Sequence, residues 1–260
     1  MSKSETIEIP CGPLASVTLP AKPRNEGITA AIDGGLPLSV FRDCVEQSSE
    51  FLDFVKFGWA SAFITKALDE KIRILRDNGI DFWIGGTALE IAYFENRVSQ
   101  FVDYVGELGA EYIEVSDGKV EFEPGEKVEL ISALSKSFRV FSEIGSKDVK
   151  QVMTPRIWIS KIREELDAGA WKIIAEGRES GTVGIYRPSG EIREGLLEEI
   201  RECGVPIEDL VFEAPNKSQQ VWLIERFSKE VNFGNIPLMD ALNIAALRLG
   251  LRADTIFIRE

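Results

Sequence analysis

Short apolar runs that end in glycine or a polar turn alternate with longer amphipathic stretches from residue 28 to the end of the chain. The short runs have the length and composition of buried strands, and the stretches between them place apolar residues at helical spacing. The clearest helices are predicted at 69–77 and 155–168, where charges separate the apolar positions. The predicted strands, in chain order, are 28–33, 52–57, 80–84, 112–115, 138–142, 171–175, 210–212 and 231–233.

This alternation predicts an α/β protein with a parallel sheet. Eight such units in 260 residues predict one closed (β/α)₈ TIM barrel, which we place at residues 22–260 as a single domain. Residues 1–21 are predicted to be an N-terminal extension, either a mobile arm or a strap across the bottom of the barrel. An open doubly wound sheet is the main alternative, but the first predicted strand is not followed by a Gly-x-Gly-x-x-Gly turn.

Composition limits the class of partner. The formal net charge of −13 argues against binding to nucleic acid, which needs a basic face. No apolar run reaches the length of a membrane span, and the polar N-terminus has no apolar signal core. The three cysteines, Cys11, Cys44 and Cys203, are scattered and fit a reducing compartment. We therefore expect a cytoplasmic homo-oligomer that acts on small molecules, with no membrane or nucleic-acid partner.

The chain contains no histidine, which restricts its chemistry. Ser-His and Cys-His nucleophile pairs, His-ligated zinc and histidine acid–base catalysis are all excluded. Proton transfer must fall to Lys, Glu, Asp, Tyr or Cys. A bound metal must be held by oxygen atoms, which favours Mg²⁺ or a similar hard cation.

Glutamates stand near the carboxyl ends of four consecutive predicted strands, where the active sites of such barrels form. Carboxylates that converge on one mouth repel one another unless a cation or interleaved lysines offset their charge. The predicted metal ligands are therefore Glu114, Glu143, Glu176 and Glu213, around Mg²⁺. For any one of them, a buried ion pair with Lys56 or Arg178 is an equal alternative.

Two glycine-containing turns are candidates for a phosphate site. The loops after the seventh and eighth strands of such barrels commonly bind phosphate through backbone N–H groups. Gly234 and Asn235 occupy that position, and Ser180 with Gly181 offers a second candidate. Trp59 is the tryptophan that we expect at the barrel mouth.

Eight segments at the predicted strand ends carry a family resemblance. They are Val55-Lys56-Phe57-Gly58-Trp59, Gly85-Gly86-Thr87, Glu114-Val115-Ser116-Asp117-Gly118, Ser142-Glu143-Ile144-Gly145-Ser146-Lys147, Glu176-Gly177-Arg178-Glu179-Ser180-Gly181, Phe212-Glu213-Ala214-Pro215-Asn216-Lys217-Ser218-Gln219-Gln220, Val231-Asn232-Phe233-Gly234-Asn235-Ile236 and Leu249-Gly250-Leu251-Arg252-Ala253-Asp254-Thr255. In this order and spacing, from about Lys22 to the C-terminus, the chain resembles the phosphosulfolactate synthase family.

The resemblance implies a lyase that adds sulfite to phosphoenolpyruvate with Mg²⁺, giving (2R)-phospho-3-sulfolactate. Such a product serves coenzyme M synthesis in methanogenic archaea and sulfolactate formation in bacteria. Lys147 matches the family's lysine after Glu-Val-Gly and is the candidate proton donor, while Lys56 and Arg178 are further candidate catalytic residues. Lys217, Arg252 and Arg178 are candidates for binding the phosphate, carboxylate and sulfite charges. For Arg252, a salt bridge to Asp254 is an equal alternative.

The sequence departs from the family pattern at three turns. Gly34 stands where the archaeal type has lysine, Ala60-Ser61 replaces the usual Gly-Thr, and Ile84 replaces a proline. Two alternative functions therefore stay open. One is a Mg²⁺-dependent barrel enzyme with a different nucleophile or phosphorylated acceptor. The other is a non-catalytic stress or binding protein of the same superfamily.

Overall fold

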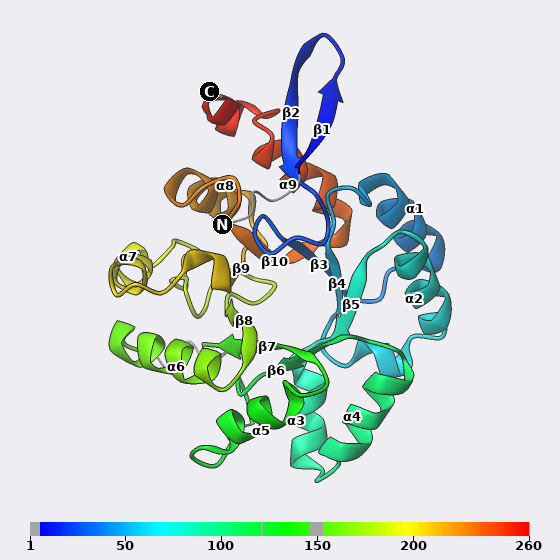
Figure 1. The fold of residues 1–260 in the computed structure, drawn as a ribbon, viewed down its shortest axis with the longest axis vertical. Coiled ribbons are helices and arrows are strands. Elements are labelled where there is room, and N and C mark those ends of the chain that lie inside the picture. The colour runs from blue at the N-terminus through cyan, green and yellow to red at the C-terminus, as the bar shows by residue number, and fades with distance from the viewer. Residues whose placement is uncertain (1–5, 121, 146–152, 260) are drawn as a thin grey trace.

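The computed structural model describes residues 6–120, 122–145 and 153–259. Its main sheet consists of eight parallel strands, which the helices surround in a ring (Figure 1). The hydrogen-bonded order is β5-β4-β3-β10-β9-β8-β7-β6, and the end strands β5 and β6 lie next to each other. The sheet is thus a nearly closed barrel, which confirms the predicted (β/α)₈ fold.

The strands agree closely with the apolar runs of the sequence. Their bounds are β3 (Thr29–Asp33), β4 (Phe54–Phe57), β5 (Asp81–Ile84), β6 (Tyr112–Val115), β7 (Arg139–Ile144), β8 (Ala170–Ala175), β9 (Leu210–Glu213) and β10 (Asn232–Pro237). Strands β7 and β10 continue past their predicted ends at 142 and 233. Glu143 and Asn235 consequently lie within strands, where their side-chain directions are set by the sheet.

Helices follow the strands around the barrel. They are α1 (Leu38–Ser48), α2 (Leu68–Asp77), α3 (Gly86–Phe94), α4 (Val98–Glu107), α5 (Glu126–Leu134), α6 (Pro155–Asp167), α7 (Glu194–Glu202), α8 (Lys217–Arg226) and α9 (Ala241–Arg248). Short 3₁₀ turns η1 (Ser61–Ile64), η2 (Ile207–Asp209), η3 (Leu238–Asp240) and η4 (Ala253–Arg259) complete the described elements. No helix in the described ranges is long and apolar enough to cross a bilayer.

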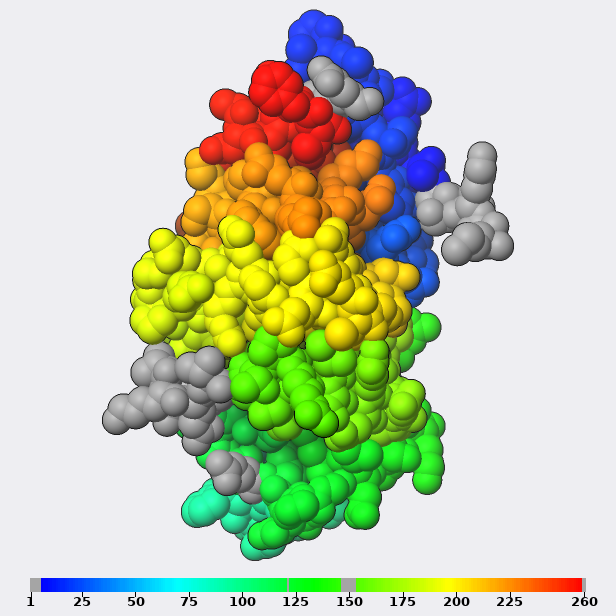
Figure 2. All heavy atoms as spheres, turned by 90° about the vertical axis from the view of Figure 1, so that its left-hand side faces the viewer, coloured from blue at the N-terminus to red at the C-terminus, as the bar shows by residue number. Residues whose placement is uncertain are grey.

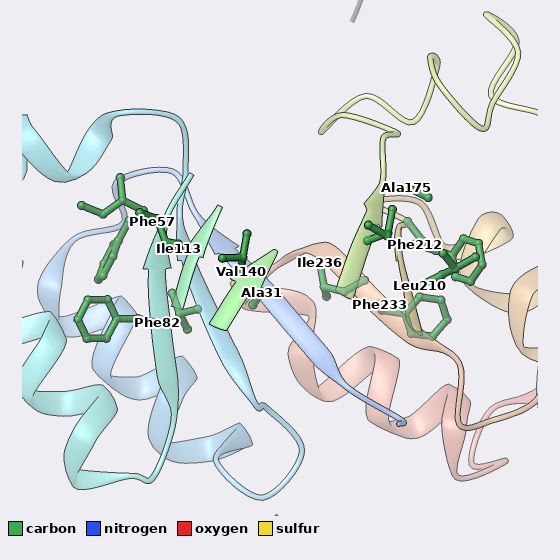
Figure 3. Close-up of a cluster of buried hydrophobic side chains, with 14 of the residues drawn as sticks. Ala31, Phe57, Phe82, Ile113, Val140, Ala175, Leu210, Phe212, Phe233 and Ile236 are labelled. Carbon is green, nitrogen blue, oxygen red and sulfur yellow. The ribbon is translucent and has the colours of Figure 1, made fainter. Parts of the chain in front are cut away.

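The hydrophobic core has two layers because neighbouring strand residues face opposite sides of the sheet. The outer layer lies between strands and helices, and Figure 3 shows Phe57, Phe82 and Phe212 in it. Phe57 stacks on Phe41 of α1, and Phe212 stacks on Phe227 at the end of α8. The inner layer fills the barrel with Ile28, Ala30, Phe54, Trp83, Tyr112, Phe141, Ile174 and Val211. This layer makes the lower barrel a solid core.

Residues 6–20 form an antiparallel hairpin of β1 (Thr6–Cys11) and β2 (Leu14–Pro20), where no strands were predicted. Figures 1 and 2 both show the hairpin beside the C-terminal segment, at one end of the molecule. After the hairpin, Arg24 forms a buried ion pair with Asp53, which also accepts a hydrogen bond from the Thr29 amide. These contacts anchor the chain just before β3.

Candidate active site

The candidate site is the layer of side chains directly above the inner aromatic layer. A residue two positions farther along a strand faces the same side, one step closer to the strand's carboxyl end. Two positions beyond Phe54, Tyr112, Phe141, Ile174 and Val211 stand Lys56, Glu114, Glu143, Glu176 and Glu213. Because of strand periodicity, these charged residues form a second layer above the apolar one, at the end of the barrel where active sites form.

This charged layer forms the floor of a pocket of about 230 Å³. Carboxylates outnumber cationic side chains in the lining, five to three, so the pocket needs additional positive charge for an anion to enter. The lining residues are Ile32, Lys56, Trp59, Gly85, Gly86, Thr87, Glu114, Lys119, Glu143, Glu176, Arg178, Glu179, Glu213 and Asn235.

Lys56 is the buried cation at the centre of the floor. Its Nζ lies 3.1 Å from Glu114 Oε2, 3.4 Å from Glu213 Oε1 and 3.8 Å from Glu143 Oε2. Lys56 and these three glutamates are all less than a tenth exposed. Charges this deep need partners, and one ammonium offsets only part of the carboxylate charge.

Glu114, on β6, links its strand to β5, the strand at the other end of the hydrogen-bonded order. Its Oε2 accepts a 2.6 Å hydrogen bond from Trp83 Nε1, and its Oε1 accepts a 2.7 Å bond from the Gly86 amide. Both oxygens thus have protein donors across the β5–β6 gap. Burial raises the pKa of the Glu114 carboxyl, the Lys56 ammonium lowers it and Glu143 raises it, with a net upward shift. The geometry indicates that Glu114 holds β5 and β6 together and pairs with Lys56.

The other three glutamates converge on a common point. One oxygen from each of Glu143, Glu176 and Glu213 lies within 4.8 Å of the corresponding oxygens of the other two. A backbone donor holds two of them, since the Arg178 amide donates hydrogen bonds of 2.8 Å to both Glu176 Oε1 and Glu213 Oε2. Ser116 Oγ lies 2.8 Å from Glu143 Oε1. Three buried carboxylates in this arrangement can hold a divalent cation.

Three non-glycine residues in the pocket lining have left-handed backbone conformations. Their φ angles are 54° for Trp59, 57° for Arg178 and 52° for Asn235. The Asn235 conformation coincides with an irregularity in the β10–β3 register between Phe233 and Ile236. Such conformations cost free energy in L-residues and cluster at functional sites. Here all three occur in residues that line one pocket.

A buried lysine supports Glu143 from behind. Lys127 Nζ donates a 2.7 Å hydrogen bond to the Glu143 carbonyl oxygen and forms ion pairs of 3.0 Å with Asp117 and Glu165. Lys161 pairs with the second oxygen of Asp117. Burial opposes the charge of Asp117, but the two lysines outweigh it and lower the pKa of this carboxyl. This network fixes the end of β7, and hence the position of the Glu143 side chain.

The backbone of Gly184 packs closely against the backbone of Glu176, a member of the acidic cluster. Its φ is +62°, and a Cβ there would lie 1.9 Å from the carbonyl oxygen of Glu176. We expect Gly184→Ala to lower the free energy of unfolding by about 3 kcal/mol, about 1 from the left-handed backbone and the rest from overlap. Urea denaturation would measure the loss. Gly204→Ala is the matched control, because its φ is +78° with no atom near the added Cβ. Equal losses in both variants would contradict the close-contact argument.

The predicted anion-binding residues do not all line the pocket. Asn235 lines the pocket, whereas Ser180, Gly181 and Gly234 are not among its lining residues. The Gly181 carbonyl accepts a hydrogen bond from Gln219, and that of Ser180 accepts one from Asn216. The β8–α7 loop is thus tied to the start of α8.

Lys217 and Arg252 lie outside the pocket lining. Lys217 pairs with Asp254 at 3.0 Å, and Arg252 Nε lies 4.0 Å from the same carboxylate, as in the alternative considered for Arg252. Their roles in substrate binding stay predictions. Lys147, the predicted proton donor, lies outside the described residues.

Sequence reasoning did not single out Thr87, Lys119 or Ile32 as site residues, although all three line the pocket. Thr87 and Lys119 follow β5 and β6 within a few residues, so their position after a strand end was a usable signal. Ile32 follows the inner-layer residue Ala30 by two positions. Strand periodicity would have placed it in the pocket.

A single (β/α)₈ barrel with charged side chains gathered at the carboxyl ends of its strands defines a class of barrel enzymes. Residues 18–254 match the family of (2R)-phospho-3-sulfolactate synthase (ComA). The phosphosulfolactate synthase of Bacillus subtilis (strain 168) is 42% identical over 239 residues, which cover 91% of this chain and 95% of that protein. The phosphosulfolactate synthase of Methanothermobacter thermautotrophicus is 37% identical over 241 residues, covering 90% and 93%. The chain therefore belongs to the phosphosulfolactate synthase family and is a lyase-type enzyme.

Solved structures agree on the fold alone. The crystal structure of a 3-hexulose-6-phosphate synthase superposes with a TM-score of 0.53 at 14% identity, covering 84% of this chain and 99% of that one. At this identity the likeness concerns the barrel and not the chemistry.

Proposed function

We propose that this enzyme adds sulfite to phosphoenolpyruvate in the presence of Mg²⁺ and forms (2R)-phospho-3-sulfolactate. The family match and the names of the curated relatives support the reaction. The convergence of Glu143, Glu176 and Glu213 is the observation that carries the metal dependence. Both substrates are anions, and the carboxylate-rich pocket would repel them without a cation.

The donor set fits Mg²⁺. The ion prefers oxygen ligands and often takes only one or two carboxylates from the protein, leaving positions for water and substrate. Asn235 Oδ1 adds a further oxygen at the same pocket. It is buried and accepts no hydrogen bond from any described residue. A buried acceptor without a donor costs free energy, which a cation or a water molecule on that cation would recover.

When bound, Mg²⁺ would act as a Lewis acid that stabilises negative charge building on the carboxylate of the substrate. The sulfur of sulfite forms a bond to C3, and the C2–C3 π electrons move to C2 and the carboxylate. A proton delivered to C2 completes the addition. Lys56 Nζ places a positive charge on the pocket floor, and Arg178 offers a planar fork for substrate oxyanions. Lys147 remains the proposed proton donor.

The test is product formation from phosphoenolpyruvate and sulfite, with and without Mg²⁺, for the parent and Lys147→Ala. We expect turnover that requires Mg²⁺ and falls by about 100-fold or more in the variant, as for loss of a general acid. Lys136→Ala is the control, since it removes an exposed lysine before β7 at the opposite end of the barrel. Metal-independent turnover would refute the role of Mg²⁺, and bound phosphoenolpyruvate without product would indicate a different nucleophile.

A further inference from the structure

Lys119 differs from the other lysines around the site in having no carboxylate partner among the residues that the structure describes. It follows β6, lines the pocket and is exposed at the mouth. Lys56 is paired with three glutamates, and Lys127 and Lys161 are paired with Asp117. Within the described ranges, Lys119 forms no salt bridge. Its ammonium is therefore available to an anion that arrives from solvent.

A buried carboxylate holds the backbone of Lys119 in place. Glu90 Oε2, on α3, accepts hydrogen bonds from the amides of Lys119 and Val120, at 2.8 and 2.9 Å. Glu90 is only 2% exposed, and Ser116 Oγ lies 2.6 Å from its Oε1. Burying a carboxylate is costly unless hydrogen bonds satisfy it. The buried Glu90 carboxylate, held by the amides of a surface loop, thus fixes the position of this loop.

The start of a helix lies on the same side of the pocket. Helix α3 begins at Gly86, and Gly85, Gly86 and Thr87 all line the pocket. The first turn of a helix carries partial positive charge. A Cβ on Gly86 would lie 2.5 Å from the Ser116 Cβ, so glycine is needed for α3 to start this close to β6. The Gly86 amide is already bound by Glu114 Oε1, so the positive charge that this side offers to an anion is that of Lys119, whereas β7, β8 and β9 contribute the acidic cluster.

We propose that Lys119 binds the anionic nucleophile, and that Glu90 is a positioning residue that sets the loop carrying Lys119. This inference rests on the function proposed above, in which the nucleophile is sulfite. The acidic cluster with its metal would hold phosphoenolpyruvate, and the second anion would then enter past the exposed lysine at the mouth. A single mobile ammonium suits a compact oxyanion, to which it donates up to three hydrogen bonds.

The test separates the Michaelis constants of the two substrates. Lys119→Ala should raise the KM for sulfite about 10- to 100-fold, the loss expected for one hydrogen bond between charged groups. The KM for phosphoenolpyruvate should change far less, and Lys119→Arg should restore most of the sulfite affinity. Lys66→Ala is the matched control, since Lys66 is exposed between β4 and α2 on the same rim but outside the pocket lining.

Glu90→Gln tests the positioning role. Glutamine keeps the shape but loses the negative charge, so its one acceptor oxygen binds the two loop amides more weakly than the carboxylate does. We expect a higher KM for sulfite and faster hydrogen exchange at the Lys119 and Val120 amides, with the KM for phosphoenolpyruvate nearly unchanged. Equal increases in both KM values would reduce Glu90 to a general structural role.

Calorimetry of sulfite binding distinguishes failure of this inference from failure of the proposed function. A parent that makes no product but binds sulfite through Lys119 would refute the reaction and keep the anion site. An unchanged sulfite KM in Lys119→Ala, or an effect matched by Lys66→Ala, would overturn the inference. A selective rise in the KM for phosphoenolpyruvate would overturn it too, by assigning Lys119 to that substrate.

Discussion

Replacing Lys56 with methionine should lower the free energy of unfolding by about 3–5 kcal/mol, the usual cost of removing one partner from a buried ion pair. Methionine keeps most of the apolar stem but leaves Glu114, Glu143 and Glu213 without the shared ammonium that lies 3.1–3.8 Å from them. Urea denaturation in the presence of a chelator would measure the loss, because a bound divalent cation would mask it.

The loss should depend on pH. In the folded parent, burial already raises the pKa of Glu114, whereas Lys56 lowers it, so removing Lys56 should raise it further. A carboxyl with a raised folded pKa binds more protons when folded than when unfolded. Stability then falls as pH rises from the unfolded pKa through the folded one. The variant should therefore be closer to the parent at pH 5 than at pH 8.

Lys217→Met is the matched control for Lys56→Met. Its lysine also forms a salt bridge, but that pair with Asp254 is largely exposed. Exposed pairs contribute about 0–1 kcal/mol, so the control should stay within that range. A loss of less than 1 kcal/mol in Lys56→Met would show that the three glutamates do not depend on this ammonium.

Glu176→Gln should have the largest effect on catalysis. Glutamine can still accept the hydrogen bond from the Arg178 amide that Glu176 Oε1 accepts, so the loop should stay in place. The substitution removes one of three converging carboxylates. We expect Mn²⁺ affinity, measured by electron paramagnetic resonance titration, to fall at least about 10- to 100-fold. Turnover should fall about 100- to 1000-fold, as when a group that stabilises transition-state charge is lost.

Glu179→Gln is the control for charge alone. Glu179 lines the same pocket but is exposed and lies outside the three-carboxylate cluster. Its substitution removes the same charge and should leave metal affinity nearly unchanged. If both variants lose metal affinity equally, the cation is held by the general negative potential of the pocket rather than by the cluster.

Most of the fold could be predicted from the sequence because barrel strands are buried on both faces. Each strand reads as a short apolar run, and β6 was predicted with its observed bounds of Tyr112–Val115. Helix α6 ends one residue before its predicted end. The hairpin of β1 and β2 was missed because its strands are mostly exposed and interrupted by proline and glycine, so they carry no such signal.

Part of the site was also readable from the sequence. Glu143, Glu176 and Glu213 stand near strand ends and come together, as the closure of a parallel barrel requires. Glu114 was assigned with them, yet its oxygens are occupied by Trp83, Gly86 and Lys56. A position after a strand cannot reveal such partners, since they come from neighbouring strands. Whether Glu114 also reaches a metal stays a prediction.

The sequence by itself determined the barrel, its family and the layer of charge above the aromatic layer, because strand periodicity and local apolar runs are properties of consecutive residues. The tertiary structure alone decided which charges pair and which stay available. Lys56 is shared by residues 58, 87 and 157 positions away, and Lys119 is held by Glu90 on a helix before β6. The left-handed turns at Trp59, Arg178 and Asn235 were likewise settled by packing. Contacts between distant segments depend on register and closure, which no local pattern encodes.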